Sequence, residues 1–320
     1  MRIKGLNGAA RAVAGLAVAG FMLVAQAGIA TAQAPLTVVL GYERASLSAK
    51  AFSLIDVDLS IALASAVATE YLVGDSGAKA RARVAAAGPD ERVILVMDDF
   101  ETTAASLAAP ALKPIAKLSR GISLALVVPE KSDIHDWPEF VKALAGRPLK
   151  VAASGLGSVT GMGAALAAKV AGGRIEPVVT ESTLASFALV ADAQVDAAVV
   201  TTFDLPLINA LTNRAVTPIV TYGAKRAPGL NRTPTLSEVA GNQELAFTTS
   251  VSVYASPQMN QALARQLTAA ILRAGQTKET AAAARAANFP LQVEGPEIVA
   301  ATTSRDLKLA RRFKDVLAGN

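Results

Sequence analysis

The sequence predicts an α/β fold built on mostly parallel β-sheet. Short runs rich in Val, Ile and Leu, bounded by turn residues, alternate with helix-like segments after residue 32. Such alternation is typical of strands joined by helical crossovers. The expected buried strands cover residues 36–41, 92–97, 122–128, 149–154, 195–200 and 217–222.

Four segments have patterns that favour helices. Residues 136–146 and 297–317 have helical character, and residues 256–275 begin with Ser256 as the expected cap. Residues 53–63 fit both a strand alternation and a helix face, and the β-then-α order favours a helix. In residues 256–275 the apolar side chains recur every four positions, at Met259, Leu263, Leu267 and Ile271.

The first 32 residues have the pattern of a secretory signal peptide. Three basic residues precede an apolar stretch that ends in the small-x-small tripeptide Ala30-Thr31-Ala32, and no acidic residue occurs before Glu43. We expect cleavage near Ala32 and a mature protein in the periplasm. The alternative, an uncleaved anchor, needs about 20 strongly apolar residues, whereas Gln26 interrupts this stretch.

Composition excludes several function classes. The formal net charge is +5, and removing the three basic residues of the signal leaves about +2, which is too small for a nucleic-acid-binding footprint. The chain has no cysteine and one histidine, so a catalytic triad or a zinc site could use only His135. The sequence has no G-x-S-x-G nucleophile motif. We therefore expect a binding protein without a cofactor or metal rather than an enzyme.

Residues 151–173 join a strand, a glycine-rich turn and a helix. The N-terminus of a helix presents unpaired N–H groups and about half a positive charge. We expect this one to bind a carboxylate. The expected donors are the backbone N–H groups of Gly157, Ser158 and Val159 together with the hydroxyls of Ser154, Ser158 and Thr160.

Two alternatives remain for the same turn. Gly155, Gly157 and Gly161 form a loose version of the dinucleotide-binding pattern, and Glu181 lies about where a ribose-binding acid belongs. On that hypothesis the protein would be a nucleotide-binding oxidoreductase. The other alternative is a tight turn with a satisfied cap and no ligand.

Acidic residues follow the expected strand 92–97. Asp98, Asp99 and Glu101 could face a ligand ammonium or a divalent cation, and we take Asp99 as the candidate ligand residue. The alternative is that Asp98 or Asp99 caps a helix with Glu101 in its first turn.

Further candidates follow the first and fifth expected strands. Arg44 could pair with a carboxylate, and Tyr42 could cover an apolar face of the ligand. Thr201 and Thr202 end the strand 195–200, where they could donate hydroxyl hydrogen bonds or simply be solvated.

Several short motifs follow a pattern known from one family of proteins. Ser154, Gly155, Gly157 and Ser158 form a Ser-x-Gly-x-Gly-Ser-like turn. Other matching positions are Gly77, Ala78, Pro89, Asp90, Val195 and Asp196. The best match lies in residues 222–241, at Arg226, Pro228, Pro234, Thr235, Leu236 and Glu238. In these motifs the chain resembles the extracytoplasmic solute receptors of tripartite tricarboxylate transporters, also called Bug or TctC-like proteins.

The resemblance implies a two-lobe, Venus-flytrap periplasmic-binding-protein architecture of type II. Lobe 1 would comprise residues 33–126 plus 250–320, lobe 2 residues 127–249, and the ligand would bind in the cleft between them. Two loops depart from the family, the one after the first strand and the one that contains Thr180, which is a further candidate ligand residue. The identity of the ligand therefore cannot be carried over from the family.

Together these observations predict a monomeric periplasmic receptor that captures a small carboxylate or zwitterion and delivers it to membrane transporter subunits or a sensor kinase. The alternatives are a receptor for an ABC-type importer, an exported α/β enzyme, and the oxidoreductase that would use the Gly155–Gly161 turn.

Overall fold

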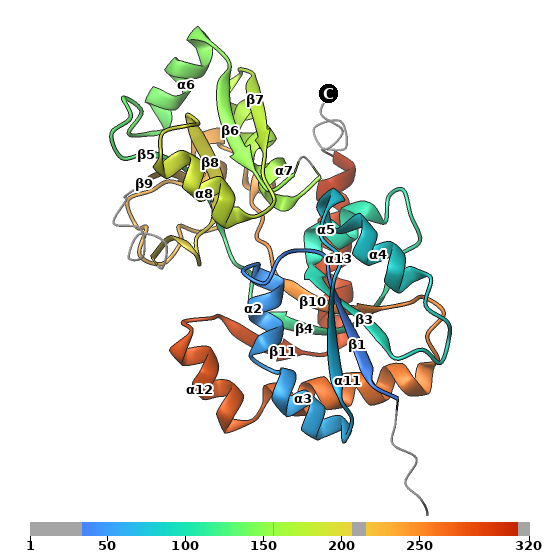
Figure 1. Cartoon of the computed structure of the whole chain (residues 1–320). Coiled ribbons are helices and arrows are strands. Elements are labelled where there is room, and N and C mark those ends of the chain that lie inside the picture. Colours follow the sequence, from blue (N-terminus) through green and yellow to red (C-terminus); the bar gives the residue numbers. More distant parts are fainter. Residues whose placement is uncertain (1–33, 156, 207–215, 313–320) are drawn as a thin grey trace, which may run out of the picture. The chain divides into compact units, whose positions relative to one another are not determined.

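The computed structural model describes residues 34–155, 157–206 and 216–312, and the strands of these residues form two mixed sheets (Figure 1). The six-stranded sheet has the order β11-β4-β10-β3-β1-β2. Its strands are β1 (Leu36–Leu40), β2 (Val67–Tyr71), β3 (Val93–Asp98), β4 (Lys113–Ser119), β10 (Val251–Ala255) and β11 (Leu291–Glu294). The expected signal peptide lies outside the described residues.

The five-stranded sheet has the order β7-β6-β8-β5-β9. Its strands are β5 (Leu124–Pro129), β6 (Leu149–Ala153), β7 (Ile175–Val179), β8 (Ala197–Thr201) and β9 (Val216–Thr221). The α/β class is confirmed, and each of the six expected strands is present within two residues of its expected bounds.

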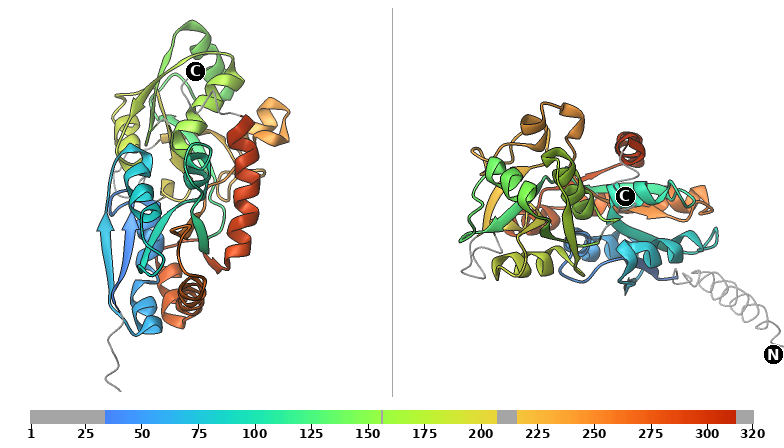
Figure 2. Two further views of the ribbon diagram at one scale, coloured as in Figure 1. Left: turned by 90° about the vertical axis from the view of Figure 1, so that its right-hand side faces the viewer. Right: turned by 90° about the horizontal axis from the view of Figure 1, so that it is seen from above.

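The expectation of mostly parallel sheets is wrong in one respect. Pairs β1–β2, β1–β3, β6–β7 and β6–β8 are parallel, whereas β10 runs antiparallel to β3 and β4, and β5 antiparallel to β8 and β9. The chain leaves the first sheet after β4 and returns to it in β10, so these strands are not joined by helical crossovers that would make them parallel. Figure 2 shows β1 and the edge strand β2 side by side.

Helices flank both sheets. Those on the first sheet are α2 (Leu47–Ser53), α3 (Asp56–Leu63), α4 (Ala78–Ala85), α5 (Asp99–Ala105), α11 (Gln261–Gly275), α12 (Lys278–Ala286) and α13 (Pro296–Arg312). Those on the second are α6 (Trp137–Gly146), α7 (Val159–Ala171), α8 (Thr183–Ala191) and the short α10 (Leu236–Ala240). None of the helices in the described part of the chain is long and apolar enough to cross a bilayer.

The ambiguous segment 53–63 is helical apart from a turn at Leu54 and Ile55 that separates α2 from α3, so the order of elements predicts it correctly. Leu59 and Leu63 are buried, whereas Val57 and Ile61 are 67% and 70% exposed. Of the alternating apolar residues that suggested a strand, every second one is thus exposed to solvent. The apolar residues that pack on the core are those on one face of the helix.

Helix α11 begins later than expected. Its N-cap is Asn260, whose side chain accepts the N–H of Ala262, while Ser256 accepts the N–H of Gln258 in a preceding turn. The expectation that Ser256 caps this helix is therefore wrong. The expected apolar face is right, because Met259, Leu267 and Ile271 are buried.

The matched motif of residues 234–238 has a structural role. Thr235 and Glu238 form a reciprocal capping box at the start of α10, and Arg226 pairs with Glu238 at 3.0 Å. This arrangement fixes the loop that follows β9, away from the cavity described next.

Candidate functional site

Loops from both sheets converge on one polar cavity of about 60 Å³. It lies where β1, β3 and β8 end, at the N-terminal ends of α5, α7 and α8, and beside the segment that leads into β10. The residues that line it are Tyr42, Leu47, Ser48, Asp98, Glu101, Ser154, Val159, Thr160, Ser182, Thr183, Thr201, Thr249 and Val251.

The turn between β6 and α7 brings the start of α7 to this cavity. Ser158 is the N-cap, and its Oγ accepts the N–H of Gly161 at 3.0 Å and donates to the carbonyl of Gly155 at 2.7 Å. Gly155 has φ +126°, and a Cβ there would lie 2.5 Å from Ser76 Oγ. Position 155 therefore favours glycine for both conformational and steric reasons.

Three hydroxyls form a small cluster beneath the turn. Thr160 Oγ1 lies 2.8 Å from Ser154 Oγ and 2.9 Å from Ser158 Oγ, and it accepts the N–H of Ser154 at 3.0 Å. The three hydroxyls hydrogen-bond to one another, and the hydroxyl of Ser158 also caps α7. Ser154 and Thr160 line the cavity as well. The cluster therefore orders the turn at the edge of the cavity.

The N-terminus of α7 is already paired with a carboxylate of the protein. The N–H of Val159, the first helical residue, donates to Glu101 Oε1 at 3.2 Å, and the hydroxyl of Tyr42 donates to Glu101 Oε2 at 2.8 Å. Glu101 is itself in the first turn of α5, where Asp98 accepts its N–H at 3.1 Å as the N-cap. The predicted helix-cap role of the acidic stretch is confirmed for Asp98.

Burial dominates the electrostatics of these groups. It raises the pKa of Glu101 to about 7, although the hydrogen bonds from Tyr42 and Val159 and the charge of Arg81 oppose this. Burial also raises the pKa of Asp98, and the neighbouring Glu101 and Asp99 charges add to the effect. Burial and the Glu101 charge raise the pKa of Tyr42 as well, so its hydroxyl stays a proton donor.

Five of the predicted site residues line the cavity: Tyr42, Ser154, Val159, Thr160 and Thr201. The other six lie outside its lining: Arg44, Asp99, Gly157, Ser158, Thr180 and Thr202. Ser158 contributes indirectly, since its side chain caps α7 from a buried position.

Three of the outlying residues have other partners. The Arg44 guanidinium stacks over the Tyr71 ring at 4.8 Å from its centroid. Thr202 donates to the carbonyl of Ser123 at 2.9 Å. Thr180 Oγ1 lies 2.6 Å from the Ser186 hydroxyl, which fixes the start of α8.

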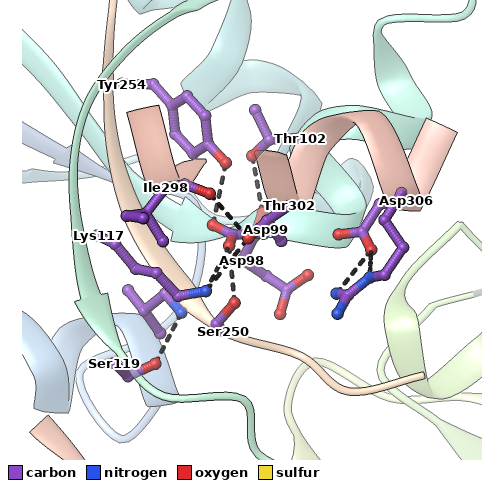
Figure 3. A network of polar contacts seen from close by, with 12 residues as sticks. Asp98, Asp99, Thr102, Lys117, Ser119, Ser250, Tyr254, Ile298, Thr302 and Asp306 are labelled. Carbon is purple, nitrogen blue, oxygen red and sulfur yellow. Dashed lines mark hydrogen bonds and ion pairs between the residues drawn. The ribbon is translucent and has the colours of Figure 1, made fainter. Parts of the chain in front are cut away.

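Asp99 points away from the cavity into a buried network shown in Figure 3. Its carboxylate accepts hydrogen bonds from Ser250 at 2.7 Å and Tyr254 at 3.0 Å, and Lys117 Nζ lies 4.0 Å away. Burial raises the pKa of Asp99, and these donors counteract the rise. Asp306 of α13 belongs to the same region, where burial raises its pKa to about 6. This network joins β4, β10 and α13 to the start of α5.

The sequence analysis chose Asp99 as a ligand residue, whereas the structure places Asp98 and Glu101 at the cavity. Successive side chains at the start of a helix point in different directions, so neighbours in the sequence face different surroundings. It also missed Ser182, the N-cap of α8, whose signal is a serine three residues before Ala185 in an apolar run. Thr249 has no local signal, because only the pairing of its segment with Ile122 places it here. The other missed lining residues are Leu47, Ser48, Thr183 and Val251.

Two alternatives for the site were binding of a dinucleotide and binding of a divalent cation. Glu181, the candidate ribose-binding acid, is exposed and does not line the cavity. No group of three or more metal-ligating side chains occurs among residues 34–155, 157–206 and 216–312.

The fold is that of a known class of binding proteins. The periplasmic binding protein BugD superposes with a TM-score of 0.76 at 16% identity over 89% of this chain and 98% of its own. MatC (Rpa3494) from Rhodopseudomonas palustris, solved with malate, gives 0.76 at 21% identity over 89% and 99%. Rpa4515 from R. palustris, solved with adipate, gives 0.74 at 17% identity over 89% and 98%.

These similarities show that the chain has the two-lobe periplasmic-binding-protein fold. The fold that the resemblance to Bug and TctC-like receptors predicts is thereby confirmed. No family model matches the sequence, and no curated protein matches it either.

Proposed function

We propose that this protein is a periplasmic receptor that captures a small carboxylate-bearing solute and delivers it to a membrane transporter. The observation that carries the proposal is the carboxylate of Glu101 at the N-terminus of α7, inside a cavity lined from both sheets. A site that stabilises one carboxylate through a backbone N–H and a helix dipole can hold another in its place.

In this proposal the ligand carboxylate replaces Glu101 at the N–H of Val159. Ser154 and Thr160 supply hydroxyls around it, and Tyr42 covers it from the first sheet, whereas the hydroxyl of Thr201 donates to Asp204 at 2.6 Å. Backbone and hydroxyl donors bind a carboxylate without a permanent ion pair, which suits a receptor that must release its ligand. The similar folds of MatC and Rpa4515, solved with malate and adipate, support the choice of a carboxylate.

The proposed division into two lobes corresponds to the two sheets. We assign residues 33–126 plus 250–320 to lobe 1 and 127–249 to lobe 2, with the ligand between them, and we expect the mature receptor to be monomeric. The placement of β10 in the first sheet and of β6 to β9 in the second supports this division, while β5 of the second sheet begins at Leu124, three residues before the assigned boundary. Export by the sequence 1–32 would place the receptor in the periplasm, where binding rather than catalysis would be its role.

A thermal-shift panel of small acids and amino acids tests the proposal. A ligand at 1,000 times its Kd stabilises the folded protein by about 4 kcal/mol, which is a clear rise in Tm. We expect at least one such compound to raise Tm and to be recovered unchanged after incubation. A panel that leaves Tm unchanged while NADH raises it would instead favour the oxidoreductase alternative.

A further inference from the structure

Among the residues that the structure describes, the cavity is lined by two carboxylates and by no lysine, arginine or histidine. Asp98 and Glu101 are both at most 9% exposed, so solvent screens their charges poorly. The carboxyl group of Glu101 receives two hydrogen bonds, from Tyr42 and Val159, and both donors are uncharged.

Three neighbouring cations hydrogen-bond or pair with other groups, although the charge of Arg81 still acts on Glu101. Arg81 donates at 3.3 Å to the backbone carbonyl of Glu101 rather than to its carboxylate. Lys50 pairs with Asp204 at 2.8 Å, and Lys117 lies beside Asp99. A fully anionic ligand would therefore bring further negative charge to Asp98 and to Glu101, whose charge Arg81 offsets only in part, which is unfavourable in a buried site.

A separate feature of the cavity also points to a ligand. Thr249 lines it and is 1% exposed, and its Oγ1 has no hydrogen-bond partner among the described residues. The backbone of Thr249 is fixed, because its N–H and carbonyl both pair with Ile122. A buried hydroxyl without a partner is costly, so its presence in the lining indicates a polar ligand atom within its reach.

We propose, on the basis of the receptor function above, that the ligand is a zwitterion whose ammonium group is bound by Glu101 and Asp98. The ammonium has three donors, matching acceptor-only carboxylates and the oxygen of Thr249. When the ligand carboxylate takes the N–H of Val159, Glu101 loses that partner and gains a charge-assisted one. The site then discriminates an amino acid from the corresponding hydroxy acid.

Matched ligand pairs test this directly. Alanine and lactate, aspartate and malate, and glutamate and 2-hydroxyglutarate differ only in an ammonium or hydroxyl at one carbon. We expect titration calorimetry on the full mature chain to show the amino acid of the best-binding pair bound at least tenfold more tightly.

The variant Glu101→Gln should remove that preference, because an uncharged amide no longer stabilises the ammonium. Asp98→Asn, which keeps a good helix cap, should weaken amino-acid binding without weakening hydroxy-acid binding. If either variant fails to fold, the wild-type preference and Thr249→Val still decide the matter.

Equal or tighter binding of the hydroxy acid by the wild type would overturn the zwitterion proposal while leaving the receptor function intact. Binding of neither member of any pair, nor of any other small acid, would overturn both.

Discussion

The N–H of Val159 lies 3.2 Å from Glu101 Oε1, so the first residue of α7 on the second sheet is paired with a carboxylate that follows the first sheet. This pair connects three properties of the site. It shows that the helix N-terminus accepts an anion, it buries Glu101, and it makes the ligand a competitor of an internal carboxylate.

The raised pKa of Glu101 predicts a pH-dependent stability. Its pKa is about 7 in the folded chain against 4.5 for an ordinary glutamate, so the folded state binds the proton more tightly. The contribution of Glu101 to the free energy of unfolding is therefore greatest below pH 4.5. This contribution falls by about 3 kcal/mol as the pH rises to about 7.

Chemical denaturation at pH 5 and pH 8 measures this effect. We expect the variant Glu101→Gln to lose the Glu101 contribution, while Asp98, Asp99 and Asp306, whose raised pKa values act in the same direction, still contribute. An unchanged difference between the two pH values in the variant would show that Glu101 is ionised in the folded protein well below pH 7.

The cap of α7 supports the binding site, and its removal should affect both stability and affinity. Ser158→Ala deletes the acceptor of the Gly161 N–H, which costs about 1 kcal/mol, and loosens the turn that positions Val159. We expect a lower Tm together with weaker ligand binding.

The matched control is Asp136→Ala, which removes the N-cap of α6 outside the cavity lining. It should lower Tm by a similar amount and leave the ligand affinity of the folded protein unchanged. Equal affinities for both variants would mean that the turn does not position the ligand.

Asp99 should matter for stability and not for binding. Asp99→Ala leaves Ser250, Tyr254 and Lys117 without their shared buried partner, and we expect a loss of about 3 kcal/mol. Denaturation and titration of the same sample separate the two effects. A variant of normal stability that binds its ligand poorly would place Asp99 in the site after all.

The Thr249 hydroxyl should show the opposite behaviour. Thr249→Val preserves the shape of the side chain and removes a buried group that lacks a partner, so the stability of the ligand-free protein should stay the same or rise. We expect ligand binding to weaken by about tenfold, since each lost hydrogen bond to a charged group costs about 1.5 kcal/mol or more. A destabilised variant with normal affinity would assign the hydroxyl a structural role.

The sequence predicted those parts of the fold that have strong local patterns. The strands around Val96 and Val199 are apolar runs buried on both faces, and they were found. Strands β2 and β7 were missed because they are edge strands with exposed residues, and β4 because Lys113, Pro114 and Lys117 interrupt its apolar pattern. Strands β10 and β11 were missed as well, although every residue of β10 is buried.

The site was predictable where it depends on one turn and not where it depends on distant pairing. Ser154, Val159 and Thr160 lie within a single strand–turn–helix segment, which can be recognised in the sequence by its glycines. The contact between Glu101 and Val159 joins residues 58 positions apart, and the position of Thr249 depends on its pairing with Ile122. Neither the contact nor the pairing can be predicted from the local sequence.

The variant Val159→Pro tests the central claim most directly. Val159 is the first residue of α7 and follows an extended Ser158, so proline fits there and removes the N–H that holds the carboxylate. It also replaces the buried valine side chain, for which Val159→Ala is the control. Titration calorimetry with the best-binding ligand should show at least a tenfold loss of affinity in Val159→Pro, against little change in Val159→Ala, which keeps the N–H. A folded Val159→Pro protein that binds this ligand as tightly as the wild type would contradict the account.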